Sequence, residues 1–403
     1  MNVNRTGAGL PVSRLLVPWF ALVVILQSGC AQLGPDAMRV SRLSYNEAVQ
    51  ASDQRELLLN LVRLRYTEAP EFLQISSIST QMNFEASAGI GGEFGEVEAN
   101  NSSFVTPGAS VGYSESPTIS FVPRRDQEFT RQLVTPVELD SLYLLTSYGW
   151  GVDRALLLIA REVNGISNIS TREYSSFAGH DQQTFQKLIM LMRQLVAERL
   201  IAVDVQRRRG VVSAHIPHDS VSVEDFMKVH EEGYQLEENA EKTGYILAQD
   251  RRNYVMSVDA KAWGRPGLTA VTDVLNIKAN QPFYEIDGKG KARGDGIHLT
   301  TRSVLEMMAY LSNAVSVPED HAGLVDANVA TNPALQQYMN IRVSKSPRED
   351  MFLAVKYRDH WFYIIDNDLE SKRTLGLLTS LIRLTISAGG AQNVPVLTLP
   401  VSR

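Results

Sequence analysis

Two stretches of strictly alternating apolar and polar residues constrain this fold more than any other feature of the sequence. The apolar side of the first stretch, Gln81 to Gly95, consists of Met82, Phe84, Ala86, Ala88, Ile90, Gly92 and Phe94. The corresponding side of the second stretch consists of Ala109, Val111, Tyr113, Glu115, Pro117, Ile119 and Phe121. A period of two indicates extended strands with one apolar face. Two such strands around the polar loop of residues 96–107 predict a long β-hairpin.

The hairpin admits two environments. Its strands are long enough to cross a bilayer, which takes about 9–11 residues. Two strands cannot close a sheet, and an open sheet edge is not tolerated in lipid, so several subunits would each contribute one hairpin. In this pattern the hairpin resembles oligomeric outer-membrane ducts. The alternative is a soluble hairpin with one face on a helix, which Glu115 and Pro117 on the apolar side favour.

In either environment, the apolar face is a candidate surface for membrane or partner contact. Its expected members are Met82, Phe84, Ile90, Phe94, Val111 and Tyr113.

The N-terminal residues have the pattern of an export signal. Arg5 and Arg14 are the only charges before Asp36, and an apolar run extends from Leu15 to Leu26. A helix of that length spans roughly 18 Å, whereas a transmembrane helix needs roughly 20 residues. The run is therefore interpreted as the apolar segment of a cleaved signal rather than a permanent span.

The end of this run resembles the lipobox of bacterial lipoprotein precursors. Ser28, Gly29 and Cys30 match the motif, while Gln27 stands where that family has a branched apolar residue. The resemblance implies that Cys30 is acylated and that cleavage occurs just before it. Two or more acyl chains give stable anchoring, and Ala31 is compatible with outer-membrane sorting in that family. The alternatives are an incidental Cys30 after an ordinary signal peptide, or an uncleaved anchor.

Composition excludes several classes of protein. The single cysteine rules out a disulfide framework and a cysteine-based zinc site. The net charge is −6, and removal of residues 1–29 leaves 37 basic against 45 acidic residues, or −8. We therefore expect no nucleic-acid partner.

The remaining pattern predicts an α+β fold, with a helical and amphipathic-hairpin N-terminal region and a mixed C-terminal domain. The expected segments are a signal peptide (1–29), a tether and helix (30–70), the hairpin (71–125), a helical region with a C-terminal β-hairpin (126–217), an acidic linker (218–243) that begins with a short helix, and an α+β domain (244–403). The expected helices cover residues 46–65, 136–148, 152–163, 184–199, 266–278, 303–315 and 369–387. The expected strands cover residues 200–205, 211–216, 245–249, 254–259, 352–356, 361–365 and 396–399, with a basic turn at Arg207–Gly210 joining the first two.

No constellation of residues predicts catalysis, a cofactor or a metal. His215, His218 and Asp219 are neighbours with poor ligand spacing, and His230 lies beyond them. His180, His298, His321 and His360 are isolated in the sequence. Asp366 and Asp368 have the chemistry of a glycosidase pair, but Asp368 is explained as the N-cap of the following helix. Residues 357–361 either edge a binding groove or form a hairpin turn.

The C-terminal stretches of residues 355–363 and 395–400 resemble uncharacterised bacterial lipoproteins. The sequence thus predicts a lipid-anchored, periplasm-facing protein of the outer membrane with a structural or assembly role, oligomeric through its hairpin. The alternatives are a monomeric adaptor, which binds another envelope protein through the hairpin or the acidic segment, and a cell-wall hydrolase. An enzyme is the less favoured class because no catalytic set is present.

Overall fold

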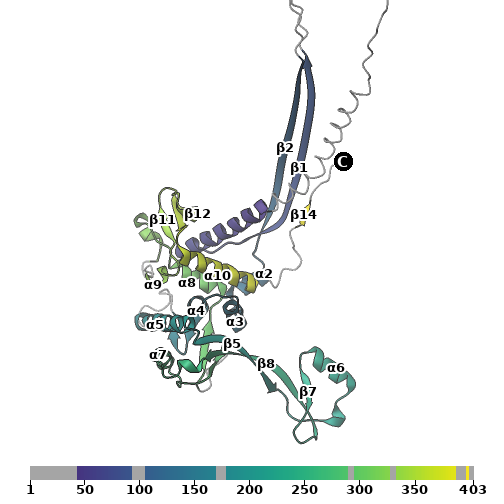
Figure 1. Ribbon diagram of the computed structural model, residues 1–403, viewed down its shortest axis with the longest axis vertical. Coiled ribbons are helices and arrows are strands. Elements are labelled where there is room, and N and C mark those ends of the chain that lie inside the picture. Colours follow the sequence, from purple (N-terminus) through teal and green to yellow (C-terminus); the bar gives the residue numbers. More distant parts are fainter. Residues whose placement is uncertain are drawn as a thin grey trace, which may run out of the picture. The chain divides into compact units, whose positions relative to one another are not determined.

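The computed structural model describes residues 43–92, 105–168, 178–288, 295–326, 333–386 and 396–398. The expected mixed α+β fold is confirmed. The chain divides into two compact units, Met1–Leu58 and Leu59–Arg403. A helix over residues 43–65 begins in the first unit and ends in the second, close to the helix expected at 46–65. The sheets that the described residues form, labelled in Figure 1, all belong to the second unit.

The first sheet is the predicted long hairpin with one added strand. Strand β1 covers Leu73–Gly92 and β2 covers Val105–Pro123, in antiparallel register from Leu73↔Pro123 to Gly92↔Val105. One irregularity lies between Ile75 and Ser77. Strand β14, Val396–Thr398, pairs in parallel with the outer edge of β1. The sheet order is therefore β14-β1-β2.

The second sheet has the order β4-β3-β10-β9-β8-β5. Its strands are β3 (Ala160–Val163), β4 (Ile166–Ser167), β5 (Ile201–Val211), β8 (Gly244–Val258), β9 (Phe283–Asp287) and β10 (Ile297–Thr301). Strands β9 and β10 are parallel, and the other neighbours are antiparallel. Two short strands, β6 (Ile216–Pro217) and β7 (Gln235–Glu238), also pair with β8.

Two turns expected in this region are wrong. The basic run at Arg207–Arg209 continues β5 instead of turning, and the break expected between Gln249 and Tyr254 lies inside continuous β8. Each run is extended because it pairs with the other, with Arg207 opposite Arg252 and Arg209 opposite Asp250. Hydrogen bonds of the ladder pair the backbone N–H and C=O groups of both runs, so the polar side chains do not cause a turn.

The acidic segment, for which the sequence predicts a short helix and then a linker, has regular structure in both parts. It contains a 3₁₀ turn η1 (His218–Ser220), helix α6 (Val223–Glu231) and strand β7. A reciprocal capping box between Ser222 and Asp225 begins α6. Strand β5 precedes this segment and β8 follows it, and the two strands pair along their length. The same sheet therefore contains residues from both sides of the segment.

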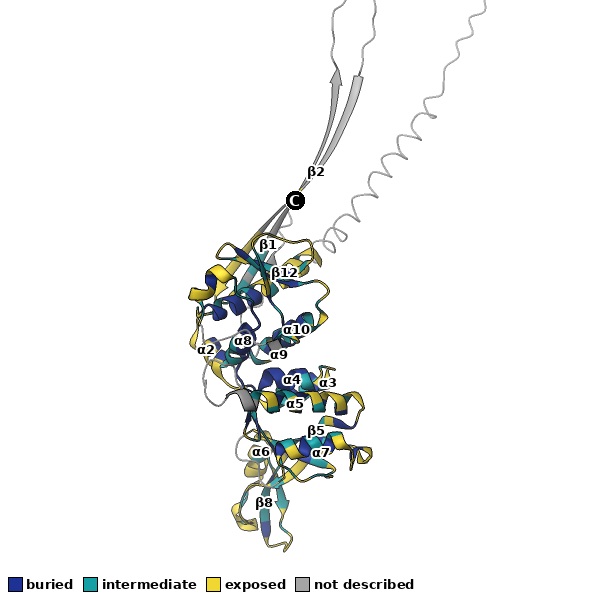
Figure 2. Ribbon diagram, turned by 90° about the vertical axis from the view of Figure 1, so that its left-hand side faces the viewer, coloured by how far each residue is buried: buried dark blue, intermediate teal, exposed yellow. Residues whose placement is uncertain are grey.

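Helices supply most of the buried core. Besides the helix over residues 43–65, they are α2 (Gln127–Val134), α3 (Leu139–Ser147), α4 (Val152–Ile159), α5 (Ala178–Ala197), α7 (Pro266–Leu275), α8 (Val304–Ser312), α9 (Pro333–Gln336) and α10 (Leu369–Ile386). Helix α4 contacts α5, α8 and α10, and buried positions are dense in α4 and α8 (Figure 2). It is shorter than expected because residues 160–163 form β3. No helix among the described residues is both long and apolar enough to cross a bilayer.

The C-terminal end of α4 is held by a buried arginine. Arg302 Nη1 donates to the carbonyl oxygens of Leu157 and Leu158, both at 3.2 Å, and Nη2 donates to Asn168 O. Its guanidinium lies 4.2 Å from the centroid of the Tyr310 ring. Burial lowers the pKa of Arg302 to about 10. The guanidinium therefore supplies the donors that the last carbonyls of a helix lack.

The third sheet has the order β11-β13-β12, from β11 (Arg342–Ser344), β12 (Met351–Tyr357) and β13 (His360–Ile365). The turn expected between β12 and β13 is confirmed, with Arg358 at φ 45° and Asp359 at φ 64°. Positive φ at both central residues is typical of a tight two-residue hairpin turn. Asp368 caps α10 as expected, because its Oδ1 accepts from Ser371 N at 3.0 Å.

Candidate functional site

The strongest candidate for an interaction site is the outer part of the β1–β2 hairpin. Among the described strands, β2 pairs with β1 alone, and β14 covers the far edge of β1 only at Ser77–Ser79. From residue 80 to 92 on β1 and from 105 to 117 on β2, the ladder therefore has two outer edges without a described partner. Such edges present rows of backbone donors and acceptors to any further strand.

The register places the expected face residues together. Phe84 pairs with Tyr113, Ala86 with Val111 and Met82 with Glu115. Directly opposite positions of an antiparallel ladder share a face, so the alternation in the sequence becomes one continuous face of the hairpin. Ile90 falls on the same face, opposite Pro107. Phe94 and Cys30 lie outside the described residues.

The base of the hairpin is fastened by polar contacts. Asn60, fully buried, donates from Nδ2 to Glu71 O at 2.7 Å and accepts from Glu71 N at 3.1 Å. The Glu71 carboxylate pairs with Arg125 in a forked arrangement at 3.0 and 3.1 Å. The Phe72 ring meets the Phe129 ring of α2 edge-on, with centroids 5.4 Å apart. These contacts fix both strands where they leave the rest of the second unit.

A second cluster lies beside the β12–β13 turn. Tyr66 OH lies 2.7 Å from His321 Nδ1, and its ring packs against the rings of Tyr357 and Phe362. Burial raises the pKa of Tyr66 to about 12, with the neighbouring Tyr357 adding to the effect. The phenol therefore keeps its proton at neutral pH.

Glu68 and Arg358 complete the rim of this cluster. Tyr357 OH donates to Glu68 Oε1 at 2.5 Å, and Arg358 Nη2 donates to the same oxygen at 2.9 Å. The hydrogen bond from Tyr357 lowers the pKa of Glu68. The carboxylate is thus ionised at neutral pH, and its Oε1 accepts from both neighbours.

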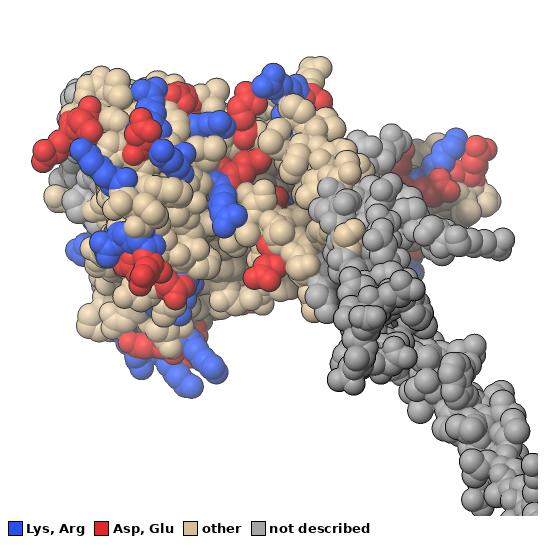
Figure 3. Space-filling model, turned by 90° about the horizontal axis from the view of Figure 1, so that it is seen from above, with Lys and Arg blue, Asp and Glu red and all other residues tan. Residues whose placement is uncertain are grey.

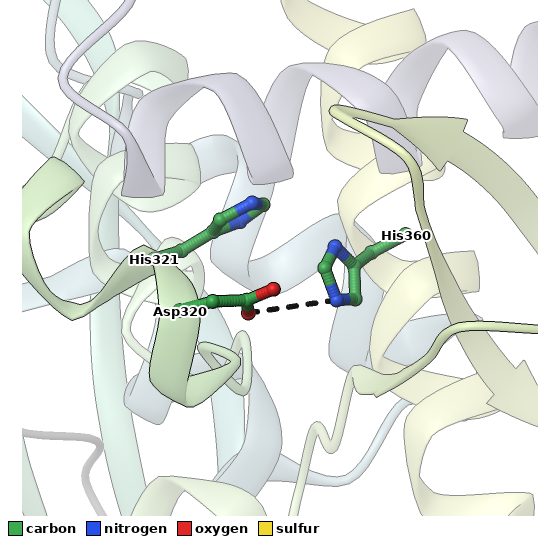
Figure 4. A group of neighbouring side chains, drawn as sticks. All are labelled: Asp320, His321 and His360. Atoms are coloured by element: carbon green, nitrogen blue, oxygen red, sulfur yellow. Dashed lines mark ion pairs between the residues drawn. The ribbon is translucent and has the colours of Figure 1, made fainter.

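Three potential metal ligands meet next to Tyr66. Asp320, His321 and His360 form the group of histidines and carboxylates, among the described residues, whose geometry suits a metal ion (Figure 4). Both histidines are isolated along the sequence, and the fold brings them together with Asp320. Residues 66, 320–321 and 360 are far apart in the chain, so no local spacing could have revealed the group.

The other candidate groups do not assemble. His215, His218 and His230 are exposed; His215 Nδ1 faces the Asn239 amide at 3.1 Å, and His218 Nε2 lies 3.6 Å from Glu238 Oε1. Asp366 pairs with Lys372, while Asp368 is the helix cap. Both carboxylates thus have structural partners, as the sequence predicted for Asp368.

Basic and acidic side chains are interspersed on the face shown in Figure 3. Ion pairs among the described residues include Arg348 with Asp350 at 2.8 Å. No family model, curated protein or solved structure matches this chain.

Proposed function

We propose that this protein is a lipid-anchored outer-membrane protein, facing the periplasm, that assembles with further copies of itself through the β1–β2 hairpin. The observation that carries the proposal is the open ladder of residues 80–92 against 105–117. The basic start, short apolar run and Cys30 of the sequence support export and anchoring.

The open ladder has the dimensions for such a role. Each strand contributes 13 residues from the last β14 pair to the end of the ladder. At about 3.3 Å per residue, this length is about 43 Å, which exceeds what a membrane-crossing strand requires. A hairpin of this length also has enough backbone groups on each edge to specify a stable strand pairing.

The two edges are complementary. If β2 of one copy pairs with β1 of the next, the antiparallel order of the strands continues from copy to copy. This contact is head-to-tail, and such contacts close into rings when the rotation between copies allows it. Strand β14 does not obstruct the pairing, because it covers β1 only at Ser77–Ser79.

The proposal is tested by the mass of the full chain extracted in mild detergent. Light scattering that accounts for bound detergent should give a particle of several copies, because the hairpin edges pair between chains. A monomer at all concentrations would contradict assembly. Labelling with a fatty-acid probe, and its loss in Cys30→Ser, separately tests the anchor.

Matched variants test which face of the hairpin is used. The double variant Phe84→Asp/Ile90→Asp adds two charges to the apolar face, whereas Asn83→Asp/Ser87→Asp adds two charges to the opposite face. A lipid-facing charge at mid-depth costs about 2–4 kcal/mol for Arg or Lys and less for Asp. The first variant should lose the assembly while the second keeps it. Equal behaviour of both variants would refute the use of this face.

The adaptor alternative is favoured by one observation on α6. Val223 and Met227, one helical turn apart, are 82% and 63% exposed, beside the acidic Glu224. An exposed apolar pair with acidic neighbours suits a partner that is apolar and basic. A monomeric mass, together with photo-crosslinking from position 227 to one envelope protein, would select this function instead.

A further inference from the structure

Three side chains from two separate segments converge beside the β12–β13 turn. Asp320 and His321 lie in the 3₁₀ turn η3 (Glu319–Leu324), and His360 is the first residue of β13. One ligand atom from each lies within 4.8 Å of the other two. His360 Nε2 is 3.6 Å from Asp320 Oδ1, and the two imidazole centroids are 4.7 Å apart (Figure 4).

The orientation of His360 leaves one nitrogen for a ligand. Its Nδ1 lies 3.2 Å from the carbonyl oxygen of Arg358, and a carbonyl can only accept, so Nδ1 carries the hydrogen. Neutral His360 then presents the lone pair of Nε2 toward Asp320. This nitrogen is buried and has no hydrogen-bond partner in the described chain. The side chain is only 7% exposed.

Two electron-rich atoms therefore face each other across 3.6 Å. A lone pair and a carboxylate repel one another unless a positive species lies between them. Either a proton on His360 or a metal cation satisfies this arrangement.

His321 is oriented in the same manner. Tyr66 Oη lies 2.7 Å from Nδ1. When Nδ1 carries the hydrogen and donates it to the phenol oxygen, Nε2 has the free lone pair that a metal requires. A hydrogen-bond partner on the second ring nitrogen is the usual support for a metal-binding histidine. Both rings are thus held through Nδ1.

The charges around the site are compatible with a cation. Lys345 Nζ lies 3.9 Å from Asp320 Oδ2, but its side chain is 81% exposed and the pair is screened by solvent. Arg358 is engaged by Glu68 and Tyr357. The carboxylate itself is 53% exposed, which gives an ion a path from solvent and leaves room for a water ligand.

We propose that Asp320, His321 and His360 bind one divalent transition-metal ion of the zinc type, with water completing the coordination. Two imidazoles and one carboxylate are ligands of the right hardness for such an ion. Ligand atoms around tetrahedral zinc lie about 3.4 Å apart, close to the 3.6 Å already separating His360 from Asp320. The ion would join η3 to the start of β13.

The first experiment titrates the full chain, stripped with a chelator, with Zn²⁺ by calorimetry and with Co²⁺ by visible absorption. We expect one equivalent of Zn²⁺ to bind, and we expect the d–d absorption of four-coordinate Co²⁺. A chain that binds neither ion would overturn the proposal and leave a protonated His360–Asp320 pair as the explanation of the geometry.

Variants locate the site. Asp320→Asn and His360→Gln should each weaken Zn²⁺ binding by about 100-fold or more, since even supporting groups contribute about 10–100-fold. The matched control is His298→Gln, because His298 also has a buried ring nitrogen without a hydrogen-bond partner in the described chain. That variant should bind normally.

Asp320→Asn keeps the proposal testable even if loss of His360 disturbs folding, because Asp320 is half-exposed. Added Zn²⁺ should raise the melting temperature of the wild type and of His298→Gln, but not of Asp320→Asn. Undiminished Zn²⁺ binding by Asp320→Asn would place the ion elsewhere and refute the assignment.

Discussion

Replacement of the buried Arg302 by methionine should destabilise the second unit strongly. The change removes the donors to Leu158 O and Asn168 O, whereas Leu157 O keeps the Asn168 side-chain amide at 2.9 Å. An unsatisfied buried carbonyl costs about 1–3 kcal/mol. Loss of the contact with the Tyr310 ring adds about 1–2 kcal/mol. Relief of the buried charge offsets part of this, so we expect a net loss of about 3–5 kcal/mol.

The measurement is urea unfolding of the full chain, followed by circular dichroism. With a slope of about 3 kcal/mol per M, the midpoint should fall by about 1 M or more. The matched control is Arg161→Met. Arg161 pairs with Glu306 at 3.5 Å, but its side chain is 58% exposed, so its loss should cost less than about 1 kcal/mol.

A third variant separates charge from geometry. Arg302→Lys keeps a cation but not the fork that reaches several carbonyl oxygens, so its stability should fall between those of the wild type and Arg302→Met. If Arg302→Met were as stable as Arg161→Met, the argument that Arg302 closes the end of α4 would be wrong.

Two further predictions concern a helix cap and a tyrosine. Asp368→Ala should lower the free energy of unfolding by about 1 kcal/mol, because the hydrogen bond from Ser371 N is lost. The control is Asp366→Ala, which removes an exposed carboxylate and should change the free energy of unfolding less in the same urea assay. Burial, assisted by a hydrogen bond to Asp140, raises the pKa of Tyr254 from 10.0 to about 12. Between pH 10 and 12 the folded chain therefore keeps a proton on Tyr254 that the unfolded chain loses. The stability advantage of the wild type over Tyr254→Phe should shrink as the pH rises through this range. An unchanged difference between their urea midpoints would contradict this.

Local signals in the sequence were sufficient for much of the fold. Strict alternation predicted the β1–β2 hairpin, and Pro266 at a first turn and Asp368 before an apolar stripe predicted the starts of α7 and α10. These signals work because caps and alternation are decided by residues within a few positions of each other.

Long-range pairing explains the failures. Arg207–Arg209 and the polar centre of β8 look like turns in isolation, but each becomes a strand because the other is its neighbour. An ion pair at 2.5 Å between Arg208 and Glu285 adds a further link across the sheet surface. The cluster of Asp320, His321 and His360 escaped the sequence analysis for the same reason, since tertiary packing alone unites it.

The pairing of β14 with β1 sets the order in which this protein can finish folding. Ser77 pairs with Val396, which is more than 300 residues later in the chain. The third strand of that sheet can therefore form only after residue 396 has been synthesised. Until then, β1 has a longer bare edge, available to neighbouring chains. A shortened chain that stops before residue 396 should keep its hairpin but self-associate more readily than the full chain. Strand β14 would then limit association through the edge of β1 until synthesis has passed residue 396.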